Sequence, residues 1–297
     1  DDVLACLKPI WQIKTVTALR VRGRIERVLD AAAARGLRSR DNPARWRGNL
    51  EHLLPKPKDV SKPENQPALP YRQLGAFMAH LRQQTGIGAK PLELAILANA
   101  RAGEVCGATW SEIDLDNRCW HIPAARMKAD KDHHIPLSDA AVRLLLSIPR
   151  IEGIDYVFPG IKKGKTISDS TMNKLIRQMH DNEVKAGRAG YIDVKQGRVV
   201  VTHGFRSTFR DWAGETTAYA REVIEHAMAH QLKDKAEAAY ARGSMFEKRR
   251  RLMADWAAFC EIEQRAAEVV PIRKTALPTC PPPVFSVCLV YPVYPSK

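Results

Sequence analysis

A short passage near the C-terminal end combines side chains that can hold a phosphate, move protons around it and attack it. It runs from His203-Gly-Phe-Arg206 through His230 to Tyr240. A tyrosine hydroxyl is a weak nucleophile until its proton is withdrawn or its developing charge is stabilised. His203 precedes Arg206 by one helical turn, so both side chains can reach the same oxygen atoms. The passage therefore predicts attack on a phosphate by a tyrosine.

A second arginine, far upstream, could complete a clamp for the phosphate. Arg101 lies in Asn99-Ala-Arg101-Ala-Gly-Glu104, a sequence typical of a turn that leads into a buried segment. Planar guanidinium groups match the geometry of phosphate oxygens and stay charged at any working pH. We therefore expect Arg101 and Arg206 to bind the phosphate together, and Glu104 to support Arg101.

The charge of the chain points to a polyanionic partner. Lys and Arg number 47 against 33 Asp and Glu, a formal net charge of +14 over 297 residues. Such an excess favours nucleic acid over an anionic membrane. No apolar run approaches the roughly 20 residues that cross a bilayer, and no signal peptide opens the sequence. We therefore expect a cytoplasmic, nucleoid-associated protein.

Helical segments would have to position most of these groups. Residues 1–54 show helical periodicity, with a break near Gly36 and a further helix expected after Pro43. Residues 55–70 contain five prolines and predict an extended linker without a regular element, so we place a domain boundary at 55–65. One face of the second helix carries four arginines that are either solvated or in contact with the DNA backbone: Arg20, Arg22, Arg24 and Arg27.

The second unit, residues 66–263, has mixed patterns that predict a mainly α fold with a small antiparallel β-sheet. The loop 123–133 carries basic residues between two strand-like runs and predicts a β-hairpin with a basic tip. The proline-rich tail, 264–297, is expected to be disordered. Helical patterns cover 74–81, 92–100, 139–147, 169–180 and much of 203–263, and strand patterns cover 119–122, 134–137, 191–194 and 199–201.

Several spaced motifs together resemble the tyrosine recombinases, and within them the integrases of prophages and genomic islands. The resemblance runs in order through about residues 1–260. The motifs that carry it are Ala100-Arg-Ala-Gly-Glu-Val105, Trp110-Ser-Glu-Ile-Asp114, Ile122-Pro-Ala-Ala-Arg-Met-Lys128, His203-Gly-Phe-Arg-Ser-Thr208 and Ala238-Ala-Tyr-Ala-Arg242.

The resemblance assigns a role to each candidate residue. It implies that Arg101 and Arg206 are the paired catalytic arginines, and that His203 and His230 contact the phosphate or transfer protons. Tyr240, ten residues after His230, is implied as the nucleophile among seven tyrosines. The departing deoxyribose oxygen needs a proton, because an alkoxide is a very poor leaving group. Lys128 matches the hairpin lysine that would supply it, and Lys131, in the same loop, is a rival acid or a DNA contact.

The resemblance also implies an architecture and a set of partners. Residues 1–54 would be most of a helical core-binding domain, and 66–263 the catalytic domain, closing on DNA as a two-domain C-shaped clamp. The implied activity is strand cleavage and rejoining through a 3′-phosphotyrosine, with no cofactor, metal or ATP, to integrate or excise a mobile element. The expected partners are double-stranded DNA with attachment-site core sequences, three further copies of the chain in a homotetramer, and a host bending factor or excisionase. The N-terminal arm-binding domain of this subgroup is expected to be missing.

The same residue types also occur in proteins with other functions. His226 and His230 have the i, i+4 spacing of a zinc pair, but the metalloprotease signature needs Glu after the first His, whereas Glu225 precedes it. Type IB topoisomerases use similar chemistry, but the helical N-terminal unit and the hairpin favour an integrase. A DNA-binding remnant that no longer cuts is the alternative from another class. The six scattered cysteines are expected to be reduced thiols, with neither disulfides nor a zinc site.

Overall fold

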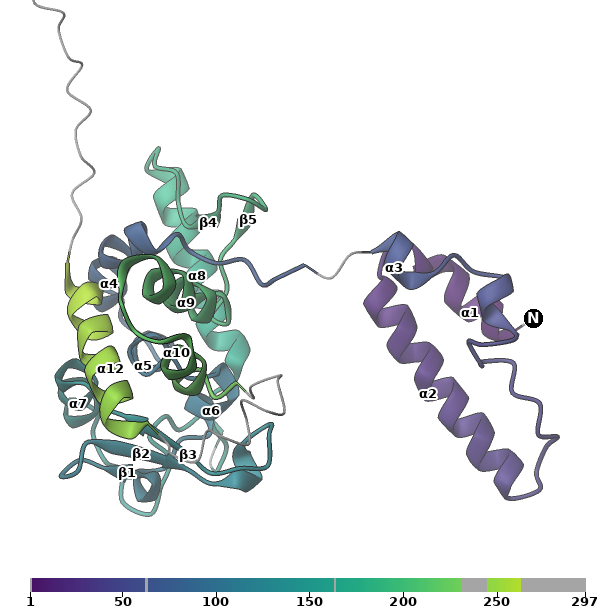
Figure 1. The fold of residues 1–297 in the computed structure, drawn as a ribbon, viewed down its shortest axis with the longest axis horizontal. Coiled ribbons are helices and arrows are strands. Elements are labelled where there is room, and N and C mark those ends of the chain that lie inside the picture. Colours follow the sequence, from purple (N-terminus) through teal and green to yellow (C-terminus); the bar gives the residue numbers. More distant parts are fainter. Residues whose placement is uncertain (1, 62–63, 163, 231–244, 263–297) are drawn as a thin grey trace, which may run out of the picture. The chain divides into compact units, whose positions relative to one another are not determined.

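The structure is a computed structural model that describes residues 2–61, 64–162, 164–230 and 245–262. It is mainly helical, with two small antiparallel sheets (Figure 1). The fold class expected from the sequence is therefore confirmed. The tail at 264–297, expected to be disordered, lies outside the described residues.

Two helices, α1 (Asp2–Trp11) and α2 (Thr15–Ala34), form most of the N-terminal part. They pack through a small apolar core whose largest side chain, Trp11, stacks on Trp46 with ring centroids 5.5 Å apart. Helix α2 ends as its sequence predicts, because Gly36 takes a left-handed conformation (φ +71°) that a side chain would disfavour. The buried members of this core are Leu7, Trp11, Ala18, Leu50 and Leu54.

The segment after α2 departs from prediction in two places. The prediction of a helix after Pro43 is wrong, because this segment forms turns and one short 3₁₀ helix, η1 (Leu50–His52). The expectation that 55–70 contains no regular element is also wrong, because Pro57–Val60 forms the short helix α3. Pro57 opens α3, where a missing N–H costs nothing. The indole of Trp11 donates to the carbonyl of Pro55 (2.9 Å) and thereby fixes α3 to the N-terminal core.

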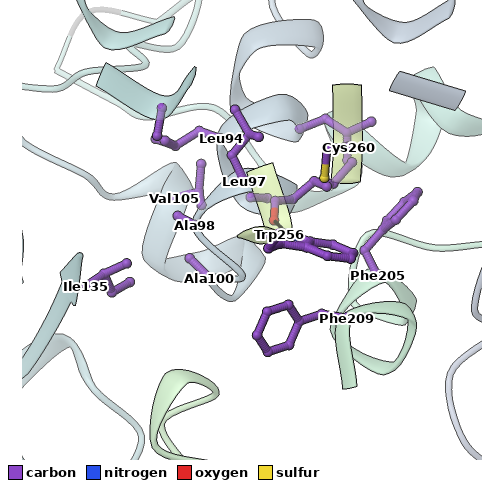
Figure 2. Close-up of a cluster of buried hydrophobic side chains, with 14 of the residues drawn as sticks. Leu94, Leu97, Ala98, Ala100, Val105, Ile135, Phe205, Phe209, Trp256 and Cys260 are labelled. Carbon is purple, nitrogen blue, oxygen red and sulfur yellow. Dashed lines mark hydrogen bonds between the residues drawn. The ribbon is translucent and has the colours of Figure 1, made fainter. Parts of the chain in front are cut away.

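The core of the larger part is built around α5 (Ala89–Leu97), which is apolar on nearly every face and therefore buried. Helices α4 (Leu74–Arg82) and α12 (Phe246–Glu261) pack against it. Figure 2 shows Leu94 and Leu97 of α5 converging with Phe205, Phe209 and the α12 residues Trp256 and Cys260. The indole of Trp256 donates to the carbonyl of Ile96 (2.8 Å), which satisfies its one polar group inside the core.

The predicted hairpin is present, within a three-stranded antiparallel sheet. Strand β1 (Ile113–Asp114) follows α6 (Ala102–Cys106) and η3 (Trp110–Glu112) and pairs with β2 (Cys119–Ile122). Strand β3 (His133–Pro136) pairs with β2 in the register Trp120–Ile135 and starts one residue before the predicted strand. Between them, η4 (Ala124–Arg126) begins the basic loop.

The remaining elements follow the predicted order. Helix α7 (Asp139–Leu146) is capped by Ser138, whose hydroxyl accepts from the N–H of Ala141. Helix α8 (Asp169–Lys185) is five residues longer than predicted, and β4 (Ile192–Asp193) and β5 (Arg198–Val199) form the second sheet around Gly197. Two helices then lead to the site, α9 (Gly204–Thr216) and α10 (Arg221–Ala227).

The start of α9 is fixed by the extended segment that precedes α4. A Cβ atom on Gly204 would lie 1.9 Å from the carbonyl oxygen of Pro67, so only glycine fits there. The N–H of Val201 donates to that same oxygen, and the hydroxyl of Thr208 donates to the carbonyl of Leu69 (2.6 Å). The glycine of His203-Gly-Phe-Arg206 therefore lets another segment pass, and this contact sets where α9 begins.

Candidate functional site

Arg101 lies at the N-terminal end of α6, where Glu104 holds it twice. The carboxylate of Glu104 accepts from the backbone N–H of Arg101 and from its guanidinium, both at 2.7 Å. Glu104 is 5 % exposed, so the pair is largely screened from water, whereas the Arg101 side chain keeps 23 % of its surface exposed. The second nitrogen of the guanidinium donates to the carbonyl of Ala229 (3.2 Å). The geometry agrees with the supporting role expected for Glu104.

Arg206 meets the same loop from α9. Its guanidinium donates to the carbonyl oxygens of Asn99 and Met228, and it is 4 % exposed. Asn99 and Ala229 both have left-handed backbone conformations (φ +50° and +47°), so each of these loops makes a sharp turn beside the site. The fold therefore brings together two arginines that are 105 positions apart.

The two guanidinium groups lie close enough for their charges to affect each other. Burial, and then the neighbouring charge of Arg101, lower the pKa of Arg206 to about 10, against the opposing effect of Glu104 and Glu225. The buried charge of Arg206 and the partly exposed charge of Arg101 repel each other, and Glu104 offsets this only in part. An incoming phosphate would supply the remaining compensation and could accept hydrogen bonds from both groups.

His203 occupies the N-cap position of α9, where the charges of the two arginines act on it. Burial lowers its pKa below the ordinary value of 6.5, and the charges of Arg206, Arg101 and His230 lower it in turn. Its imidazole is therefore neutral at pH 7 and can accept a proton.

His230 follows α10 and is held by a buried carboxylate. Its Nδ1 lies 2.6 Å from Oε2 of Glu225, and its Nε2 lies 3.5 Å from the guanidinium of Arg206. A guanidinium only donates, so Nε2 accepts there and the proton sits on Nδ1, facing Glu225. The other oxygen of Glu225 binds Arg210 at 3.0 Å. With both ring nitrogens engaged, His230 is not available for the zinc pair with His226 that the i, i+4 spacing suggested.

Lys128 and Lys131 are both exposed on the loop between β2 and β3. The base of this loop is anchored by Arg126, whose guanidinium binds the carboxylate of Glu112 and the carbonyl oxygen of Glu104. The N–H of Ala124 donates to Asp132 (2.7 Å) and closes the loop from the other side. The anchor therefore ties the base of the lysine loop to the same Glu104 that holds Arg101.

Tyr240, the predicted nucleophile, lies outside the described residues. Its nearest rival, Tyr219, does lie within them, and its hydroxyl donates to Asp255 (2.6 Å). Burial, together with the bond and the charge of Asp255, raises the pKa of Tyr219 to about 12. A tyrosine so held is poorly placed to become a phenolate.

The arginines predicted to contact DNA in α2 divide into two kinds. Arg22 is turned into the N-terminal part, where it donates to Glu26 and to the carbonyl of Ala44, both at 2.8 Å. The structure therefore does not support Arg22 as a DNA contact. Arg20, Arg24 and Arg27 are exposed.

Sequence reasoning missed two residues that shape this site. Glu225 was noted only because it precedes His226, yet its carboxylate orients His230 five positions later. Arg126 was counted as part of a basic tip, yet it is an internal anchor. No signal in the sequence pairs Arg126 with Glu112, because the pairing depends on how the sheet packs on α6.

The comparisons with known proteins show the family of the chain. Residues 69–245 match the phage integrase family, and residues 1–49 match the phage integrase central domain. The chain therefore belongs to the phage integrase family. No helix in the described part of the chain is long and apolar enough to span a membrane.

Two curated relatives give the degree of similarity. Prophage integrase IntA of Escherichia coli K12 is 36% identical over 164 residues, which cover 54% of this chain and 36% of IntA. The integrase of Enterobacteria phage P4 is 33% identical over 216 residues, which cover 66% of this chain and 46% of that integrase. The chain thus spans less than half the length of these two relatives.

Solved structures of low identity share the fold. Lambda integrase (75–356), as a dimer bound to a COC′ core site, superposes with a TM-score of 0.53 at 16% identity, covering 82% of this chain and 78% of that one. The Tn1549 transposon integrase, in complex with transposon right end DNA, gives a TM-score of 0.52 at 13% identity over 81% of this chain and 82% of that one.

Proposed function

We propose that this chain is a site-specific DNA recombinase that cuts and rejoins strands through a 3′-phosphotyrosine on Tyr240. The observation that carries the proposal is the convergence of Arg101, Arg206 and His230 at the turn formed by Met228 and Ala229. Three groups that bind phosphate oxygens meet there from three helical segments. Membership of the phage integrase family supports integration or excision of a prophage or genomic island as the biological role.

The proposed reaction exchanges one phosphodiester for another. Arg101 and Arg206 bind the non-bridging oxygens, and neutral His203 takes the proton from the hydroxyl of Tyr240 as its oxygen attacks phosphorus. The bond from phosphorus to the 5′ oxygen breaks, and Lys128 protonates that oxygen, with Lys131 as the rival donor. Because the phosphotyrosine conserves the bond energy, reversal reseals a strand without ATP. His230, held by Glu225, would contact the phosphate.

The partners belong to the same proposal. We expect double-stranded DNA with attachment-site core sequences as substrate, and a homotetramer as the working assembly. A lambda integrase tetramer bound to a Holliday junction shares the fold, with a TM-score of 0.54 over 79% of this chain and 64% of that one. We further propose that residues 1–60 form the core-binding module, extended to include α3, and that residues 66–263 form the catalytic domain acting in the cytoplasm at the nucleoid.

Trapping the covalent intermediate tests this function. The full chain would be mixed with nicked duplexes that carry the ends of its host element, in EDTA, and denaturing gels would be examined for a labelled protein–DNA adduct. The wild type should form the adduct, Tyr240→Phe should form none while still binding DNA, and Tyr219→Phe should match the wild type. An adduct that persists in Tyr240→Phe would assign another nucleophile. Tight DNA binding with no adduct in any variant would favour the non-cutting remnant.

A further inference from the structure

Three potential metal ligands lie on one face of the three-stranded sheet, away from the core. Along β2, Trp120 and Ile122 are buried in the main core, whereas Cys119 and His121 alternate with them and therefore point to the opposite face. His134 of β3 is the direct cross-strand partner of His121. The sheet register thus places a thiol and two imidazoles side by side.

The spacing of these groups is close to that of a metal site. The Sγ atom of Cys119 and ring nitrogens of His121 and His134 all lie within 4.8 Å of one another. The two imidazole rings meet edge to face, with centroids 4.5 Å apart. Ligands at zinc distances, about 2.0–2.3 Å from one tetrahedral ion, lie roughly 3.3–3.8 Å apart. Small side-chain rotations would therefore close the three groups around one ion, with no change in the strands.

Asp114 is a candidate for the fourth ligand because it lies across the sheet from the thiol. It is the cross-strand partner of Cys119, and its carboxylate accepts from the N–H and the side-chain amide of Asn117, both at 2.8 Å. The thiolate and this carboxylate would together balance the charge of a divalent cation.

Two arginines of α12 lie beside the three candidate ligands and affect how the site would bind a cation. From α12, Arg249 donates to the carbonyl of His134 (2.7 Å), and Arg250 donates to the carbonyl of Asn117 (3.4 Å). Burial, and then the charge of Asp114, raise the pKa of the Cys119 thiol, against the opposing charges of Arg249 and Arg250, so a bound ion must displace the thiol proton. A soft metal that bonds directly to sulfur can displace the thiol proton, whereas a hard cation such as Mg²⁺ gains little from these donors.

We propose that Cys119, His121 and His134 bind zinc or a similar divalent transition metal, with Asp114 or a water as the fourth ligand. The ion would staple β1, β2 and β3 together at the base of the loop that carries Lys128. The site is separate from the phosphate chemistry, because His133 and His134 point to opposite faces of β3 and the charges of Arg101 and Arg206 act on His133, not on His134. The proposal therefore stands or falls independently of recombinase activity.

Cobalt is the probe, because a tetrahedral Co²⁺–thiolate site has characteristic charge-transfer and d–d absorption. The chelator-treated full chain should bind one equivalent of Co²⁺ with these bands, and Zn²⁺ should displace it. Cys119→Ser should abolish the charge-transfer band, and Cys6→Ser, which removes an exposed thiol in α1, should leave it intact. A band that survives in Cys119→Ser, or that disappears in Cys6→Ser, would overturn the assignment.

A second measurement guards against misfolding of the cysteine variant. His121 is exposed, so His121→Gln should leave the Tm in chelator unchanged. Its affinity for Zn²⁺ should fall at least about 10-fold, the lower end of what loss of even an indirect metal partner costs. Zn²⁺ should raise the Tm of the wild type and not that of His121→Gln. Equal zinc-dependent rises in Tm for the two proteins would refute the site.

Discussion

At the scale of single residues, Glu225 determines how His230 can act. The carboxylate is 9 % exposed and accepts from Nδ1 of the imidazole, which leaves Nε2 facing the guanidinium of Arg206. The carboxylate of a helix residue thus fixes the orientation of the imidazole that is proposed to contact the phosphate.

Glu225→Gln should slow cleavage without weakening DNA binding. Loss of a hydrogen bond to a charged group costs about 1.5–3 kcal/mol, so the single-turnover rate of adduct formation should fall about 10- to 100-fold. Combining it with His230→Gln should add little, because both changes remove the same contact. Arg210→Gln removes a largely exposed partner of Glu225 and should change the rate by less than about 3-fold. An equal loss in Arg210→Gln would contradict the role assigned to His230.

The lowered pKa of His203 predicts how the rate of adduct formation changes at acidic pH. Its pKa in the free protein is below 6.5, so the neutral, proton-accepting form predominates above that pH and is lost only as the pH falls through the lowered value. The rate of adduct formation at sub-saturating DNA reports the free protein. It should stay flat from pH 7.5 to about 6.5 and decline below it. His203→Gln should lower the plateau and remove the decline. A decline that begins well above pH 6.5 would mean that protonation of a group other than His203 limits the rate.

At the scale of elements, the site depends on where helices begin. Arg101 starts α6, His203 starts α9, and His230 follows the end of α10. The start of α9 is set by a contact outside the helix, with the extended segment at Pro67. The start of α6 is set inside the helix, where the Glu104 carboxylate accepts from the N–H of Arg101, and Arg126 contacts the other end of α6 at Gly107.

Two glycines of α9 should respond in opposite ways to alanine. Gly204→Ala places a Cβ against the backbone of Pro67, and the overpacking should lower the free energy of unfolding by about 1–3 kcal/mol. Gly214→Ala, in the same helix, meets nothing within 4 Å and should raise it by about 0.5–1 kcal/mol. Urea denaturation would measure both. Similar free energies for the two variants would mean that residue 67 does not limit the start of α9.

At the scale of the whole molecule, the proposed association with DNA depends on net charge. The net charge of +14 is spread over both parts of the chain, and α2 contributes three exposed arginines. Each phosphate neutralised by such a group releases counterions, so affinity should fall steeply as salt rises.

Replacing Arg20, Arg24 and Arg27 together with Gln should flatten this salt dependence. The log–log slope of the binding constant should lose about 0.9 for each phosphate contact removed, or up to about 2.7 for all three. Arg188→Gln is the matched control, because that guanidinium is already paired with Glu183 at 2.5 and 2.7 Å. Fluorescence anisotropy over a salt series would give both slopes. An unchanged slope in the triple variant would mean that these arginines are solvated and do not contact the DNA backbone.

The sequence by itself determined what depends on neighbours along the chain. Apolar periodicity located α4, α7 and β2, and the motifs around Arg101 and His203 identified the family and offered candidate residues for its chemistry. These signals are local, because helices, strands and turns are specified over a few residues. Prediction failed at residues 43–60, where tertiary contacts at Asn42 and Trp11 outweigh local propensity.

Only the tertiary structure decided which side chains meet. Arg22 lies in the same basic stretch of sequence as Arg20 and Arg24, yet its guanidinium donates to the carbonyl of Ala44 and the carboxylate of Glu26. Cys119, His121 and His134 show no metal-binding spacing along the chain, yet the register of β2 and β3 brings them within 4.8 Å. The physical reason is the same in both cases. Burial of the apolar face of a strand or helix sets its register and packing, and these decide which other side chains a polar residue on the opposite face contacts.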